Sequence, residues 1–170
     1  MYIKTTPLPG FGMEISGVDL SQPFDDRIMR EILQVFHTHG LIVIGNQNLD
    51  FDQYDNLTMQ FGNQRPHFLD HLRHANHPAI LNLSNIFEDG KPIGVFEGAA
   101  FWHTDVAYED PPNSSTIVYG RQWPKEGCHT YFADQMAAYD GLSESIQKIV
   151  DELVVLHHYG NRADLNENSI

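Results

Sequence analysis

The sequence predicts an α+β, β-rich fold in which short strands build a sandwich or jelly-roll core and helices flank it. Helical patterns occur early and late in the chain, whereas short apolar runs separated by turn residues fill the middle. Strands and helices do not alternate regularly, which disfavours a parallel doubly wound sheet. With 170 residues, 41% of them hydrophobic, and no internal repeat, we expect a single domain over residues 1–170.

The first predicted elements are a strand, a helix and a second strand. Residues 13–18 alternate weakly between apolar and polar, as a half-buried strand does. Asp25 or Asp26 can cap a helix that ends at Gly40, a residue suited to a left-handed C-terminal cap. The continuous apolar run 41–44 then predicts a buried strand. The apolar residues at helical spacing in this helix are Ile28, Ile32, Leu33 and Phe36.

A second helix is predicted to open at Asp50 and to close at Gly62. The His-rich stretch 66–78 that follows is interpreted as a loop or lid. Strand character resumes at residues 79–83, and the Asp89-Gly90 pair predicts the turn of a β-hairpin. The apolar face of the second helix is formed by Phe51, Tyr54, Leu57 and Phe61.

The second half of the chain contains more predicted strands and one interrupted helix. The helix covers residues 135–153, with a break at Gly141 and a new N-terminal cap at Ser143. The strands are expected at residues 101–108, 115–120, 129–133 and 154–158.

Composition excludes several classes of function. The formal net charge is −13 and the ten Lys and Arg residues are scattered, which disfavours nucleic-acid binding. No apolar run approaches the roughly 20 residues that cross a bilayer, so no membrane association is expected. The single cysteine, Cys128, excludes an internal disulfide framework and favours a cytoplasmic location.

The most distinctive motif is His103-Thr104-Asp105, which we expect to lie on a strand. Side chains at i and i+2 of a strand point to the same face, so His103 and Asp105 would converge. This is two thirds of a two-His-one-carboxylate facial triad, the arrangement that holds non-haem Fe(II). The neighbouring Phe101 and Trp102 would wall the pair with apolar groups. From spacing alone, a surface strand with a satisfied histidine stays equally open.

A second group of histidines comprises His67, His71, His74 and His77, with Asp70 among them. Several members have helical spacing, but prolines bracket the segment and no zinc-binding pattern accompanies it. We therefore interpret this group as a polar lid with exposed histidines, of which one member can reach an active site.

Four runs of the chain together carry a resemblance to a known family: residues 12–20, 39–44, 102–105 and 130–142. In this order and spacing, the chain resembles the 2-oxoglutarate-dependent dioxygenases typified by taurine dioxygenase and 2,4-dichlorophenoxyacetate dioxygenase. The resemblance implies a double-stranded β-helix (jelly roll) with flanking helices, Fe(II), 2-oxoglutarate as co-substrate and O2. It implies hydroxylation of a small organic acid or amino-acid derivative, with release of succinate and CO2, and allows a homo-oligomer.

The same resemblance assigns roles to individual residues. His103 and Asp105 would be iron ligands, and Thr130 matches the threonine that hydrogen-bonds a carboxylate of 2-oxoglutarate. His67 falls where the taurine enzymes place a substrate-contacting histidine. Asp70 stands where those enzymes have a tyrosine, and its negative charge would repel a sulfonate. Taurine itself is therefore disfavoured as the substrate.

In the family, a second iron histidine and an arginine that pairs with 2-oxoglutarate lie farther toward the C-terminus. Nothing after Ala163 matches either residue. We therefore expect residues 1–170 to be the N-terminal portion of a dioxygenase domain, truncated before its C-terminal strands, which binds iron weakly and turns over little by itself. Two alternatives stay open: an inactive fragment that acts as a binding or dimerisation module, and a cupin-like protein that uses Zn or Mn.

Overall fold

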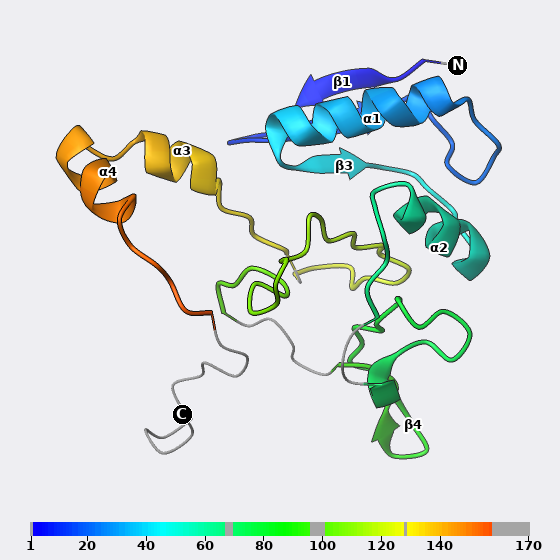
Figure 1. Cartoon of the computed structure of the whole chain (residues 1–170). Helices are drawn as coiled ribbons and strands as arrows, with labels where there is room; N and C mark the ends of the chain where they lie inside the picture. The colour runs from blue at the N-terminus through cyan, green and yellow to red at the C-terminus, as the bar shows by residue number, and fades with distance from the viewer. Residues whose placement is uncertain (1, 67–69, 96–100, 128, 158–170) are drawn as a thin grey trace. The chain divides into compact units, whose positions relative to one another are not determined.

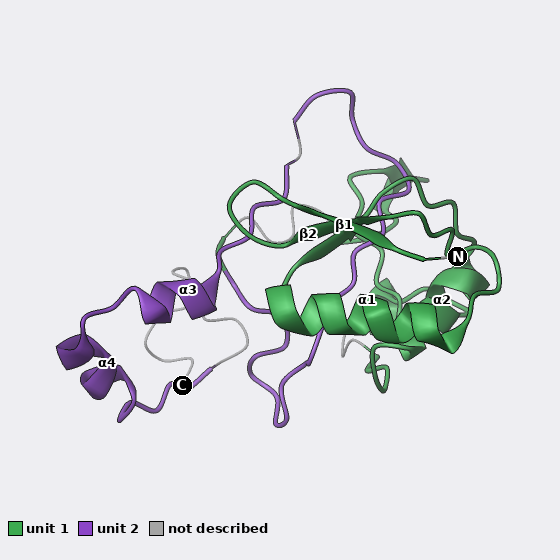
Figure 2. Ribbon diagram, turned by 90° about the horizontal axis from the view of Figure 1, so that it is seen from above, with its two compact units in different colours: residues 1–102 green, residues 103–170 purple. Residues whose placement is uncertain are grey.

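The structure is a computed structural model that describes residues 2–66, 70–95, 101–127 and 129–157 (Figure 1). Contacts along the chain divide it into two compact units, residues 1–102 and 103–170 (Figure 2). Within the described residues, no helix combines the length and the apolar character needed to cross a membrane.

The first unit is built around a three-stranded sheet with the order β1-β2-β3. Strand β1 (Lys4–Pro7) pairs antiparallel with β2 (Met13–Ser16), which pairs in parallel with β3 (Ile42–Ile44). Parallel neighbours need a crossover connection, and helix α1 (Asp26–His39) provides it. The helix packs on β2 and β3 and runs along the sheet (Figure 2).

Both predicted caps of α1 are confirmed. The Asp25 side chain accepts a hydrogen bond from the backbone N–H of Arg27 (2.8 Å), which satisfies one of the free donors of the first turn. Gly40 adopts a left-handed conformation (φ 70°), and its N–H donates to the Phe36 carbonyl (2.8 Å). The helix therefore begins and ends where its own sequence dictates.

The apolar core lies where α1 covers the sheet. Ile15, Ile28 and Ile32 are essentially inaccessible to solvent, whereas Leu33 and Phe36 are half-buried. Burial of such side chains supplies the main stabilising term of a unit of this size. The buried apolar residues are Ile15, Val18, Leu20, Ile28, Met29, Ile32, Leu49 and Ile80.

Helix α2 (Phe51–Met59) begins at the predicted residue but ends earlier than expected, at the cap residue Gln60. Asp50 and Gln53 form a reciprocal capping box, with distances of 2.8 and 2.9 Å. None of the residues of α2 is fully buried, so its predicted apolar face packs only in part. At its C-terminal side, the ring of Phe61 meets that of Phe36 edge to face at 5.9 Å.

Residues 70–95 contain a short 3₁₀ helix, η1 (Asp70–Leu72), and the predicted hairpin. Its strands β4 (Phe87–Glu88) and β5 (Lys91–Pro92) pair antiparallel. Asp89 (φ 49°) and Gly90 (φ 75°) are both left-handed, as a type I′ turn requires. The strand predicted at 79–83 is reduced to isolated bridges at Leu81 and Leu83.

In the second unit, the predicted break in the late helix is confirmed. Helix α3 (Gln135–Asp140) ends at Gly141, and α4 (Glu144–Val150) follows the N-cap Ser143. The Tyr139 hydroxyl donates to Asp151 Oδ1 (2.6 Å), which ties the two helices together. That hydrogen bond to a carboxylate raises the pKa of Tyr139.

The strand predictions for this half are wrong within the described residues. No strand forms in segments 101–108, 115–120 and 129–133 or in the described part of 154–158. Cys128 and His158 lie outside the described residues. Helices hold more residues than strands in the described chain, so the fold is α+β but not β-rich, and no jelly roll is formed there. The physical reason is that a short strand is stable only when a neighbour pairs with it.

Candidate metal centre

His103 and Asp105 approach each other at the start of the second unit. His103 Nε2 lies 3.2 Å from Asp105 Oδ1. The chain here is irregular and enters a turn at 105–108, so the predicted strand geometry is wrong although the two side chains still converge. A hydrogen bond from the Glu109 N–H to the Val106 carbonyl (3.2 Å) and the left-handed Val106 (φ 55°) define this turn.

Solvent reaches both members of the pair. The side chain of His103 is 34% exposed and that of Asp105 is 46% exposed. Phe101 and Trp102 are 61% and 72% exposed. The expectation that these two aromatic residues wall the pair is therefore wrong in this structure, because both side chains are mostly exposed to solvent.

The donor chemistry of the pair fits a first-row transition metal. A neutral imidazole nitrogen and a carboxylate oxygen are two of the three donor groups in a facial triad. Adjacent ligands at bond lengths of roughly 2.1 Å lie about 3 Å apart, which is close to the separation of these two atoms. Within the described ranges, no set of three His, Cys, Asp or Glu residues is grouped to hold a metal. The role of His103 and Asp105 as metal ligands therefore stays a prediction.

The other two predicted site residues are not brought to this pair by any described contact. Thr130 lies in an irregular, exposed stretch that precedes α3. His67 lies outside the described residues. The roles of Thr130 and His67 stay predictions.

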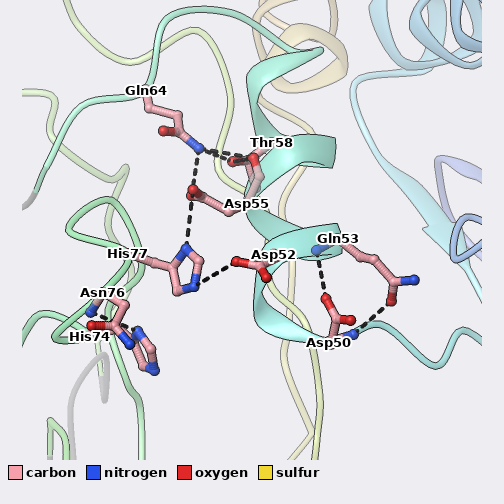
Figure 3. Close-up of polar contacts among 9 residues, drawn as sticks. All are labelled: Asp50, Asp52, Gln53, Asp55, Thr58, Gln64, His74, Asn76 and His77. Atoms are coloured by element: carbon pink, nitrogen blue, oxygen red, sulfur yellow. Dashed lines mark hydrogen bonds and ion pairs between the residues drawn. The ribbon is translucent and has the colours of Figure 1, made fainter.

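The expectation of exposed lid histidines is correct for His71 and wrong for His77. The His71 side chain is 68% exposed, with Nδ1 at 3.8 Å from Asp70 Oδ1. The His77 side chain is only 12% exposed, and its ring lies between two carboxylates of α2 (Figure 3). His77 is enclosed because the segment after η1 folds back onto α2.

Sequence reasoning missed the carboxylates that meet His77. Asp52 and Asp55 are three residues apart on α2, so they lie on neighbouring parts of one helix face. That spacing is readable from the sequence, but no sequence signal links it to a histidine more than twenty residues later. Only the tertiary structure brings these groups together.

Comparison with known proteins identifies the family to which this chain is similar. Residues 4–169 match the profile of a family described as "Taurine catabolism dioxygenase TauD, TfdA family". An "Alpha-ketoglutarate-dependent sulfonate dioxygenase" of Saccharomyces cerevisiae is 29% identical, over 92% of this chain and 39% of its own length. An "Alpha-ketoglutarate-dependent 2,4-dichlorophenoxyacetate dioxygenase" of Cupriavidus pinatubonensis is 26% identical, over 93% of this chain and 59% of its own length.

The fold is also similar to that of a solved protein. A taurine dioxygenase from Burkholderia xenovorans superposes with a TM-score of 0.63 at 23% identity, over 88% of this chain and 51% of that structure. The chain thus spans about half the length of the curated relatives and of the structure that it matches.

Proposed function

Because the chain belongs to the taurine catabolism dioxygenase TauD, TfdA family, we propose that the whole protein is an Fe(II)- and 2-oxoglutarate-dependent dioxygenase. The observation that carries the proposal is the 3.2 Å separation of His103 Nε2 and Asp105 Oδ1. When bound, the metal and co-substrate supply the oxidative chemistry: 2-oxoglutarate and O2 become succinate and CO2 as a substrate C–H bond becomes C–OH.

His103 and Asp105 would hold the metal through one imidazole nitrogen and one carboxylate oxygen. The carboxylate contributes a negative charge that offsets part of the charge of a divalent cation, and the imidazole must be neutral to bind. Because metal ligands must be deprotonated, metal affinity at such a site falls as the pH is lowered. The partial exposure of both side chains leaves them accessible to an entering ion.

Two further residues complete the proposed roles. Thr130 would donate its hydroxyl hydrogen bond to a carboxylate of 2-oxoglutarate, and His67 would contact the substrate. Support for both assignments comes from the resemblance of the surrounding runs to the family, in particular residues 130–142.

We propose a small organic acid or amino-acid derivative as the substrate. Asp70 is the residue that argues against taurine, because its carboxylate is 84% exposed and lies 3.8 Å from His71 Nδ1. A carboxylate beside a sulfonate raises the cost of binding, since like charges repel.

We further propose that residues 1–170 form part of one dioxygenase-like domain. Its jelly roll, its second iron histidine and its 2-oxoglutarate arginine would be supplied by other residues of the whole protein. The match to about half the length of the relatives supports this reading.

The test is anaerobic titration with Fe(II) followed by 2-oxoglutarate, together with succinate release in air, for the whole protein and for the 170-residue chain. We expect the whole protein to release succinate and the chain to bind iron weakly. In the whole protein, His103→Ala or Asp105→Ala should each lower succinate release by about a hundredfold or more, because a metal ligand is lost. His37→Ala, which removes an exposed histidine of α1, is the matched control.

Normal succinate release by both ligand variants would overturn the assignment of the metal centre. A strong visible charge-transfer band from the 170-residue chain alone would contradict the proposal that other residues complete the site.

A further inference from the structure

His77 occupies an unusual electrostatic position in the first unit. Its Nδ1 lies 3.2 Å from Asp55 Oδ2, and its Nε2 lies 3.4 Å from Asp52 Oδ1 (Figure 3). The His77 side chain is 12% exposed and that of Asp55 is 24% exposed, whereas that of Asp52 is 85% exposed. The Asp55 contact is thus the more enclosed of the two.

The arrangement suits one protonation state of the ring. Only an imidazolium carries two N–H donors, one on each ring nitrogen, and a carboxylate is an acceptor. In the neutral ring, one nitrogen bears a lone pair, which would face a carboxylate oxygen. The protonated ring therefore makes two charge-assisted contacts, while the neutral ring makes one hydrogen bond and one unfavourable approach.

Other groups around His77 hold this geometry. The His77 ring lies 5.0 Å from that of His74 and 6.0 Å from that of Phe51. On the other side of Asp55, Gln64 Nε2 donates to Asp55 Oδ1 (2.8 Å) and to Thr58 Oγ1 (2.6 Å). Asp55 is thereby oriented toward His77, and Asp52, Asp55 and His74 are the titratable groups that face the ring.

His77 is part of a compact turn. His74 N–H donates to the Ile80 carbonyl (2.8 Å), and Ile80 N–H donates to the His77 carbonyl (2.9 Å). Ile80 is one of the buried core residues. The ion pairs of His77 therefore connect the turn 74–80 to α2, two segments that are far apart in the sequence.

We propose that His77 is a proton-dependent latch that fastens the turn 74–80 to α2 through Asp52 and Asp55. With the ring protonated the latch is closed. Loss of the proton removes the attraction and leaves two carboxylates against an uncharged ring, so the turn opens more often. This inference concerns the conformation of the first unit and stands apart from the proposed function.

The experiment is NMR on the 170-residue chain with labelled histidine, from about pH 5 to about pH 8, combined with amide hydrogen exchange corrected for the intrinsic pH dependence. We expect protection of the His74 and Ile80 amides to fall roughly fivefold as the His77 ring loses its proton, the size expected for a partly exposed ion pair.

Three variants make the result specific. His77→Gln should abolish the pH-dependent step, and Asp55→Asn, which keeps the shape of the side chain, should lower protection at low pH and remove most of the step. His71→Gln, which removes the exposed lid histidine, should leave the step unchanged. Protection of His74 and Ile80 that does not follow the His77 titration, or a step that persists in Asp55→Asn, would overturn the latch.

Discussion

At the scale of single residues, two histidine–carboxylate contacts of the same length have different surroundings. His103 and Asp105 are both substantially exposed, whereas His77 and Asp55 are largely enclosed. Exposed ion pairs contribute about 0.2–1 kcal/mol, so the His103–Asp105 contact adds little to the stability of the fold. The enclosed contact at His77 instead connects two segments of the chain. Burial, rather than distance, distinguishes these two contacts.

Tyr54 gives a prediction at the same scale. Burial raises the pKa of Tyr54 to about 12, because the phenolate is disfavoured away from water. In the unfolded chain a tyrosine ionises near pH 10. The stability linked to neutral Tyr54 is therefore fully present below about pH 10 and is lost as the pH rises toward 12. Chemical unfolding of the chain at several alkaline pH values should show this loss.

The variant Tyr54→Phe should show a smaller loss over the same interval, since its ring cannot ionise. Tyr2→Phe is the control, because Tyr2 is 69% exposed and its substitution should leave the alkaline dependence as it is. An identical alkaline dependence in Tyr54→Phe and the parent chain would contradict the prediction.

At the scale of the element, the entry to β2 depends on a close approach of two backbones. Met13 N–H donates to the Leu41 carbonyl (2.9 Å), just before the parallel pairing of β2 with β3. A Cβ on Gly12 would lie 2.8 Å from the carbonyl oxygen of Leu41, and Gly12 has a positive φ of 87°. Glycine is required here for both conformation and space.

Gly12→Ala should therefore destabilise the chain more than Gly10→Ala. Gly10 has a similar φ of 89°, but a Cβ there meets nothing within 4 Å. The conformational strain common to both variants is about 1–2 kcal/mol. Steric overlap in Gly12→Ala should add roughly 1–3 kcal/mol. Urea unfolding measures the difference, and equal destabilisation of the two variants would show that the approach to Leu41 is not tight in solution.

At the scale of the whole molecule, four consecutive apolar residues of the second unit are exposed to solvent. They follow the end of α4 after two intervening residues, and the exposed fractions of Leu153, Val154, Val155 and Leu156 are 62%, 97%, 68% and 87%. A run of exposed apolar side chains favours association in water. The net charge of −13 opposes association by repulsion between copies.

The double variant Val154→Lys/Leu156→Lys should lower association of the 170-residue chain by about tenfold in sedimentation or light-scattering titrations, since the apolar contact area of two side chains is removed. Glu152→Lys adds the same change in net charge without removing apolar surface, and it should keep or increase association. Equal behaviour of the two variants would mean that charge, and not the apolar run, controls association.

In the whole molecule, the features that the sequence predicts correctly are the local ones. Both caps of α1, the break between α3 and α4 and the hairpin at Asp89-Gly90 are confirmed, because each depends on neighbours within a few residues. The strands predicted in the second half are wrong in the described residues, because apolar runs identify segments that can pair without identifying a partner.

The geometry of the candidate site is likewise predicted only in part by the sequence. The nearness of His103 and Asp105 follows from a separation of two residues, and the family follows from ordered motifs that span the chain. The turn that carries the pair, its exposure to solvent and the enclosure of His77 between Asp52 and Asp55 were decided by tertiary structure. The sequence by itself determines covalent neighbours and local hydrogen bonds. Burial and long-range charge pairing depend instead on which distant segments pack together.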